Sequence, residues 1–126
     1  MKHPNAQVLE KLYADLARND WEQVLSACAE NATFQISGKS PLAGKYKKTE
    51  LPNLAAKIRE LSGFRLEAHD VMASDRHGVA LVSVFFTRNG KEEQLRAAHI
   101  WRMENGKAVA WYDYPRDLYQ FDAALS

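Results

Sequence analysis

The spacing of apolar residues changes near the middle of the chain, and this change limits the folds that the sequence can adopt. Up to residue 61, apolar residues recur at every third or fourth position, which is typical of amphipathic helices at 8–17, 21–28 and 51–61. From Phe64 onward, apolar and polar residues alternate, as in strands with one buried face. Three N-terminal helices followed by an antiparallel meander predict an α+β fold, with the helices packed on one face of a curved sheet.

Turn signals divide the chain further. A β-branched and aromatic run at 33–36 predicts a short strand between the second and third helices, and residues 38–48 are expected to form a loop. The Asn-Gly pairs at 89–90 and 105–106 predict tight hairpins. A slip in the alternation at 70–71 indicates a β-bulge.

The composition is that of an ordinary globular domain, and it excludes several classes of protein. The 126 residues are 46% hydrophobic and 26% charged, which fits one domain over residues 1–126 and not a disordered chain. A formal net charge of +1 gives no reason to expect a nucleic-acid partner. Cys28 is the only cysteine, so an internal disulfide and a cysteine-rich zinc site are excluded. Because no apolar run has the length of a signal peptide or a membrane span, we expect a cytoplasmic protein without a membrane partner.

Two ionisable residues lie in strands that are otherwise apolar. His99 occupies a face that it shares with Trp101, Met103 and other apolar side chains, and Asp113 follows an apolar run in the last strand. A lone histidine in such a place is most often a hydrogen-bonded core residue. A buried aspartate is costly unless it is paired or functional, so His99 and Asp113 are candidates for an acid–base site if they share a face.

The register of the last hairpin decides whether His99 and Asp113 meet. If the turn at 105–106 has two residues, His99 lies opposite Tyr112, and Asp113 points to the other face of the sheet. If the turn has three residues and a glycine bulge, His99 lies opposite Trp111, and Asp113 shares its face. The Asn-Gly pair slightly favours the first register, and local sequence does not decide between them.

Five segments of the chain resemble the SnoaL-like branch of the nuclear transport factor 2-like superfamily, which includes polyketide cyclases. The segments are Leu12-Tyr13-Ala14 with Asn19-Asp20, residues 29–34, residues 40–46, residues 69–75, and the stretch from His99 through Trp111 to Asp113. The resemblance extends over nearly the whole chain, and the five segments occur in the same order as in the family. The resemblance implies a cone-shaped α+β barrel, in which a strongly curved mixed or antiparallel sheet and the helices enclose an apolar cavity.

The resemblance also implies where the chemistry lies. SnoaL-like cyclases place a histidine on the penultimate strand and an acid–base aspartate fourteen positions later, and His99 and Asp113 occupy those places. This supports the register with the glycine bulge. Ketosteroid isomerases carry their proton-shuttling aspartate where this chain has approximately Ile36, so we do not expect a steroid-isomerase mechanism. The acidic residue often found near Ala110 in relatives is absent here, so the cavity wall near Ala110 is expected to be apolar.

Two functions fit these residues, and the sequence leaves open whether the chain is an enzyme. As an enzyme that needs no cofactor and no metal, the domain would use Asp113 as the general base or acid on a hydrophobic carbonyl compound. His99 would stabilise the charge that develops on the substrate oxygen. The phenol of Tyr13 would donate a hydrogen bond to a flat or polycyclic ligand. The walls around this ligand would be the aromatic rings of Phe34, Trp101 and Trp111.

The alternative is a non-catalytic ligand-binding or dimerisation module. The same cavity would then hold a small apolar or aromatic ligand, with His99 and Asp113 as a satisfied buried pair. In either case the resemblance implies a homodimer formed through the outer face of the sheet, which would carry Gln94, Arg96, Ala98, Ile100 and Arg102. Trp21 is expected to pack between helices and not to line the cavity.

Overall fold

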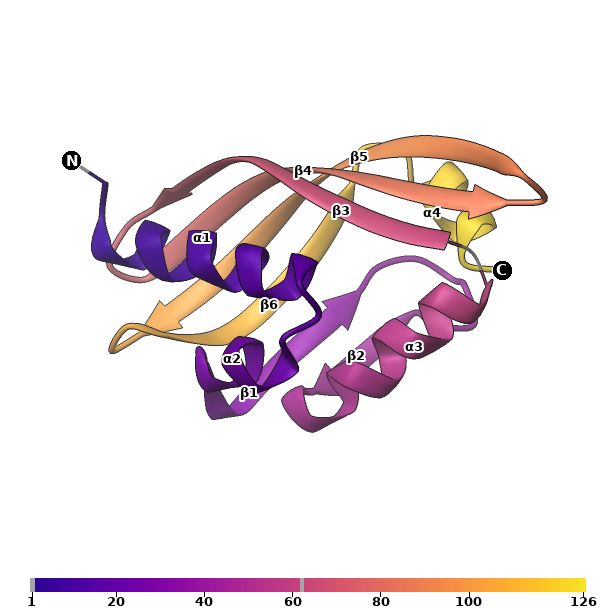
Figure 1. Ribbon diagram of the computed structural model, residues 1–126. Coiled ribbons are helices and arrows are strands. Elements are labelled where there is room, and N and C mark those ends of the chain that lie inside the picture. The colour runs from indigo at the N-terminus through magenta and orange to yellow at the C-terminus, as the bar shows by residue number, and fades with distance from the viewer. Residues whose placement is uncertain (1, 62) are drawn as a thin grey trace.

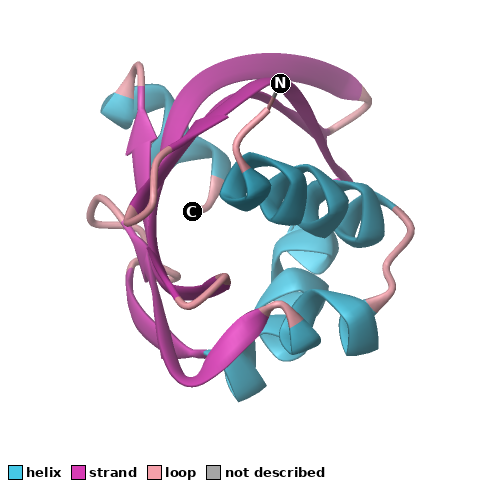
Figure 2. Cartoon of the chain, turned by 90° about the vertical axis from the view of Figure 1, so that its left-hand side faces the viewer, coloured by secondary structure: helices cyan, strands magenta, loops and turns pink. Residues whose placement is uncertain are grey.

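A computed structural model of the protein describes residues 2–61 and 63–126. A six-stranded sheet with the strand order β2-β1-β6-β5-β4-β3 curves around one side of the molecule, and α1, α2 and α3 lie on its concave side (Figures 1 and 2). The helices are α1 (Pro4–Ala17), α2 (Trp21–Ser26), α3 (Leu51–Leu61) and α4 (Leu118–Ala124), with a short 3-10 turn, η1 (Lys48–Glu50), directly before α3. The strands are β1 (Cys28–Ile36), β2 (Gly44–Lys47), β3 (Gly63–Ala73), β4 (His77–Arg88), β5 (Lys91–Glu104) and β6 (Lys107–Pro115). Within the described ranges, no helix is long and apolar enough to cross a membrane.

The sheet is mixed, and the α+β fold class predicted from the sequence is confirmed. β1 runs parallel to β6, whereas the other neighbouring strands are antiparallel. A parallel pair needs a long connection, and here it runs through β2, α3 and the meander from β3 to β5. The prediction of three N-terminal helices is imprecise, because β1, β2 and η1 separate α2 from α3.

The segment between α2 and α3 contains more strand than the sequence predicted. Cys28 fits the spacing of the second helix, yet it begins β1, since α2 ends at Ser26. The expected loop at 38–48 contains β2, whose residues 44–47 pair with residues 33–36 of β1. β2 lies at the edge of the sheet and has mostly exposed side chains, so it lacks the alternating pattern that would have revealed it.

Both predicted hairpins are confirmed. The residues at 89–90 and 105–106 have φ between 52° and 76°, so both positions of each turn adopt the left-handed conformation of a type I′ turn. The bulge predicted at 70–71 lies one position earlier, because the register of β3 against β4 shifts between Ala68 and Asp70.

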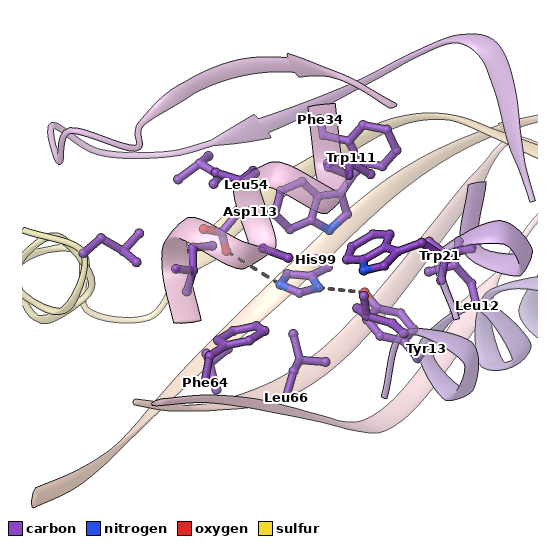
Figure 3. Close-up of a pocket in the computed structure, with 18 of the residues that line it drawn as sticks. Leu12, Tyr13, Trp21, Phe34, Leu54, Phe64, Leu66, His99, Trp111 and Asp113 are labelled. Carbon is purple, nitrogen blue, oxygen red and sulfur yellow. Dashed lines mark hydrogen bonds and ion pairs between the residues drawn. The ribbon is translucent and has the colours of Figure 1, made fainter. Parts of the chain in front are cut away.

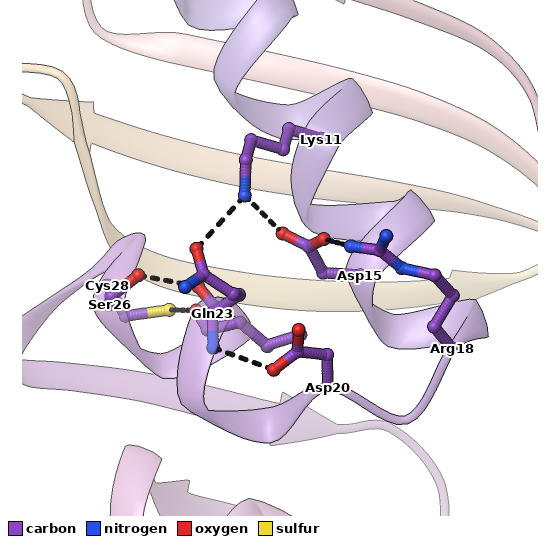
Figure 4. Close-up of polar contacts among 8 residues, drawn as sticks. Lys11, Asp15, Arg18, Asp20, Gln23, Ser26 and Cys28 are labelled. Carbon is purple, nitrogen blue, oxygen red and sulfur yellow. Dashed lines mark hydrogen bonds and ion pairs between the residues drawn. The ribbon is translucent and has the colours of Figure 1, made fainter.

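A polar cluster fixes α1 against α2 (Figure 4). Lys11 Nζ donates a hydrogen bond to Asp15 of its own helix at 2.6 Å and another to the Gln23 side chain of α2 at 3.2 Å. Arg18 also pairs with Asp15. Asp20 caps α2 by accepting a hydrogen bond from the backbone N–H of Gln23 at 3.4 Å. These contacts hold the short α2 beside the second half of α1.

The hydrophobic core fills the space between the helices and the concave face of the sheet. Its buried side chains include Leu9 and Leu12 of α1, Val82 and Phe86 of β4, and Leu125 after α4. Each apolar side chain of this size contributes roughly 1.5–3 kcal/mol when it is fully buried. Toward α3 this packing is incomplete, and the incomplete region is the candidate site.

Candidate functional site

His99 and Asp113 face each other across the β5–β6 ladder. Next to the turn, the strands have the register of a two-residue hairpin, with Glu104 opposite Lys107. A bulge at Val109 then shifts β6 by one residue, so that His99 lies directly opposite Asp113. Both registers considered from the sequence are therefore wrong at this position. The two-residue turn is present, and the bulge still brings both side chains onto one face.

This face lines a cavity of about 150 Å³ between the sheet and the helices (Figure 3). The structure brings all six side chains named from the sequence to the wall of the cavity: His99, Asp113, Tyr13, Phe34, Trp101 and Trp111. They come from four elements, α1, β1, β5 and β6. The curvature of the sheet turns the inner faces of its strands toward α1 (Figure 2), so residues far apart in the sequence meet here.

Sequence reasoning missed much of the apolar wall. Trp21 lines the cavity, so the expectation that it would not is wrong. The apolar stripe of α3 and the C-terminal segment also contribute, with Leu51, Leu54, Ala55, Ile58, Phe121 and Leu125. The helical periodicity of these residues predicts that they are buried. It does not distinguish a cavity wall from a filled core, because that depends on how closely the elements approach one another.

The polar groups of the cavity form a short chain (Figure 3). Trp101 Nε1 donates a hydrogen bond to the Tyr13 oxygen at 3.0 Å, and the Tyr13 hydroxyl lies 2.7 Å from His99 Nδ1. His99 Nε2 lies 3.8 Å from Asp113 Oδ1, a separation too long for a hydrogen bond. His99 is 4% exposed and Asp113 is 3% exposed, so bulk water does not reach either residue.

Burial sets the protonation of this group. Loss of solvent raises the pKa of Asp113 from 3.8 to about 7 and lowers the pKa of His99 from 6.5 to about 3. Burial also raises the pKa of Tyr13 above its ordinary value. At neutral pH, His99 is therefore uncharged and Tyr13 keeps its proton. Asp113 is close to half protonated, which is the condition in which a carboxyl group exchanges protons most readily.

One carboxyl oxygen in the cavity has no partner. Asp113 Oδ2 is buried and makes no hydrogen bond to any residue in the described part of the chain. An unsatisfied buried polar atom costs roughly 1–3 kcal/mol, so each one needs an explanation. The other carboxyl oxygen, Oδ1, lies 3.8 Å from His99 Nε2, so a ligand in the cavity meets a carboxyl group and an imidazole nitrogen side by side. Such a pair can move a proton to or from a molecule held between the apolar walls.

The ionisable groups of the cavity do not form a metal centre. Over residues 2–61 and 63–126, no group of three His, Cys, Asp or Glu side chains is arranged to hold a metal ion. His99 and Asp113 alone would leave most of the coordination sphere of a zinc ion unfilled.

Comparison with known proteins identifies the family to which this fold and cavity belong. A family model for the SnoaL-like domain matches residues 9–111, which is most of the chain. The protein therefore belongs to the SnoaL-like family of the nuclear transport factor 2-like superfamily, as the sequence resemblance implied. No curated protein sequence matches the chain.

Solved structures share the fold over nearly the full length. Bal32a, from a soil-derived mobile gene cassette, is 21% identical with a TM-score of 0.89, over 98% of this chain and 97% of that protein. A nuclear transport factor 2-like protein of unknown function from Burkholderia pseudomallei is 26% identical with a TM-score of 0.85, over 98% of both chains. TerC, co-crystallised with polyporic acid, is 22% identical with a TM-score of 0.85, also over 98% of both chains. These similarities establish the fold and assign no reaction to this chain.

Proposed function

We propose that this SnoaL-like domain binds a small apolar carbonyl compound in its cavity and catalyses a proton transfer on it without a cofactor. The reaction is of the cyclase, isomerase or dehydratase type. One observation carries the proposal: Asp113 lines the cavity with a buried carboxyl group whose Oδ2 has no hydrogen-bond partner among the described residues and whose Oδ1 lies 3.8 Å from His99 Nε2. A buried carboxyl group whose pKa is raised to about 7 has the properties of a general base that works near neutral pH.

The proposed step is removal of a proton from the carbon next to the carbonyl group. The C–H bond breaks, its proton goes to Asp113, and its electron pair moves onto the carbonyl oxygen as an enolate. His99 donates a hydrogen bond to that oxygen, and this hydrogen bond stabilises the enolate strongly because the site excludes water. Asp113 then returns the proton to the same carbon or to another atom of the substrate, which restores the enzyme.

The non-catalytic alternative requires His99 and Asp113 to satisfy each other as a buried pair. The distance of 3.8 Å between His99 Nε2 and Asp113 Oδ1 is too long for a hydrogen bond. The second carboxyl oxygen is also unbonded within the described ranges. A purely structural pair would be expected to close this gap, so the geometry favours the catalytic function.

Exchange of cyclohexanone α-protons with deuterium oxide tests this proposal. Cyclohexanone has one carbonyl oxygen for His99 and acidic C–H bonds for Asp113, and proton NMR follows the loss of its α-proton signal. We expect the wild-type protein to accelerate the exchange and the Asp113→Asn variant to show only the background rate. Asp70→Asn is the matched control, because Asp70 is an exposed carboxylate of β3. Equal exchange by the wild type and Asp113→Asn, or none by the wild type, would contradict the proposal.

We also infer that two copies of the chain associate through the outer face of the sheet. Leu81, Ala98 and Tyr114 are neighbours across β4, β5 and β6 on that face. Leu81 is 43% exposed and Tyr114 is 56% exposed. Contiguous apolar side chains in this position are typical of an interface, and the neighbouring Arg96 and Arg102 would provide a polar rim.

A further inference from the structure

The hydrogen bonds of the cavity determine which nitrogen of His99 carries the proton. Trp101 Nε1 can only donate, so the Tyr13 oxygen accepts its hydrogen bond. The hydroxyl hydrogen of Tyr13 then needs an acceptor, and among the described residues His99 Nδ1, at 2.7 Å, is the one in reach. Because His99 is neutral and its Nδ1 accepts, its single hydrogen lies on Nε2.

The position of Asp113 favours the same tautomer. His99 Nε2 faces Asp113 Oδ1 at 3.8 Å, so a hydrogen on Nε2 is attracted to the carboxylate, whereas a lone pair there would be repelled. The cavity therefore presents one fixed donor, His99 Nε2–H, and 3.8 Å from it one acceptor, Asp113 Oδ1. A single oxygen atom that both accepts and donates a hydrogen bond satisfies both groups, and a hydroxyl group is such an oxygen.

The cavity also limits the size and charge of its occupant. Its volume is about 150 Å³. An apolar cavity of about this volume in another protein holds one benzene ring. The lining residues are apolar or aromatic apart from the His99–Asp113–Tyr13 group, and the described lining contains neither lysine nor arginine. An anionic ligand would find no counter-charge there and would lie beside the Asp113 carboxylate.

The geometry points to a ligand class: an uncharged compound with a single ring and a hydroxyl or enol group, whose oxygen accepts from His99 Nε2–H and donates to Asp113. This inference rests on the proposed function, because an enol is the tautomer that a carbonyl compound reaches through the proposed proton transfer. It replaces the flat or polycyclic ligand expected from the sequence. Trp101 and Tyr13 are then positioning residues. They do not react with the ligand, and they hold His99 in the tautomer that recognises it.

Binding of three probes tests the ligand class without any turnover. Phenol, toluene and benzoate are titrated into the wild-type protein at about pH 8, where Asp113 is mostly ionised, and binding is measured by calorimetry. A hydrogen bond to a charged group is stronger than one between neutral groups, so we expect phenol to bind at least about tenfold more tightly than toluene. Benzoate is expected not to bind.

The outcomes separate this inference from the proposed catalysis. Equal affinities for phenol and toluene, or tight binding of benzoate, would overturn the ligand class and leave the cyclohexanone assay as the test of Asp113 chemistry. Selective binding of phenol, together with no exchange of cyclohexanone, would support the ligand class and overturn the proposed catalysis.

Nitrogen-15 NMR of the histidine side chains tests the positioning role of Trp101. We expect the wild type to show His99 as the Nε2–H tautomer. In Trp101→Phe the Tyr13 oxygen no longer accepts a hydrogen bond from residue 101, so it can accept one from His99 Nδ1–H. A population with the hydrogen on Nδ1 should therefore appear. Trp21→Phe is the matched control, because Trp21 also lines the cavity but donates its hydrogen bond to Asn19. A wild-type His99 protonated on Nδ1 would overturn the inference. An unchanged tautomer in Trp101→Phe would overturn the positioning role of Trp101 and leave Asp113 as the group that sets the tautomer.

Discussion

Asp113 lies directly opposite His99 on the neighbouring strand, and the two side chains end 3.8 Å apart inside the cavity. One extra residue, Val109, produces this relationship by shifting β6 against β5. With the regular register of the two-residue turn, Tyr112 would lie opposite His99, and Asp113 would point to the outer face. The candidate site therefore depends on a bulge, a device that re-aims side chains next to functional sites in many sheets.

Replacing Asp113 should stabilise the protein at high pH. Burial raises its pKa to about 7, so the stability that its neutral form contributes below pH 3.8 is lost as the pH rises through about 7. We expect Asp113→Asn to increase the free energy of unfolding by at least about 1 kcal/mol above pH 7 and to change it little near pH 4. Urea denaturation at the two pH values measures the difference. An equal effect at both would mean that the carboxyl group is not desolvated.

The pair of cations around Asp15 predicts the opposite pH dependence. The hydrogen bond from Lys11, followed by the contact with Arg18, lowers the pKa of Asp15 below its ordinary 3.8. The stabilisation is therefore present above pH 3.8 and is lost as the pH falls below it. We expect Asp15→Asn to lower the melting temperature at neutral pH and to have a smaller effect in acid. Glu22→Gln, at an exposed position of α2, is the control that should leave the melting temperature unchanged both at neutral pH and in acid. A melting temperature unaffected at neutral pH would remove Asp15 from the contacts that hold α1 and α2 together.

Enlarging the cavity should change the size of the ligand that it accepts. Leu54 of α3 lines the cavity and is 7% exposed. We expect Leu54→Ala to bind 2-naphthol more tightly relative to phenol than the wild type does, at a cost of about 2–5 kcal/mol in stability. Leu61→Ala is the matched control, because Leu61 lies on the same helix but is 40% exposed. If both variants keep the wild-type preference, the wall at α3 does not set the ligand size.

Charge on the outer face should prevent association of two copies. Leu81→Arg places a cation in the apolar row formed with Ala98 and Tyr114, where burial of an unpaired charge is costly. We expect light scattering to show a dimer for the wild type and a monomer for Leu81→Arg. Tyr119→Arg serves as the control, because Tyr119 is 91% exposed on α4. A wild-type monomer, or a Leu81→Arg dimer, would contradict the proposed interface.

Much of the fold could be predicted because local patterns determine it. The alternation after Phe64 and the two Asn-Gly turns define β3 to β6, and the apolar stripes define the helices. β2 could not be found in this way. It is a short edge strand with mostly exposed residues at 44–47, and its pairing with β1 is a tertiary contact that leaves no local periodicity.

The candidate site was predictable in its residues and not in its geometry. His99 and Asp113 stand out because ionisable side chains are rare in apolar strands. The bulge at Val109 has no such signal, since a β-branched residue fits a regular strand equally well. The contact of Tyr13 with His99 joins residues 86 positions apart, and it depends on how α1 packs on the sheet.

The ionisation of Asp113 is the property on which the proposed chemistry depends most directly. Carbon-13 NMR of protein labelled at the aspartate side-chain carboxyl groups follows it through a pH titration, with Asp113→Asn assigning the signal. We expect a midpoint near pH 7, as burial at the cavity wall requires. A midpoint near 3.8, the value of a carboxyl group in water, would show that Asp113 is solvated and would contradict its role as a buried base.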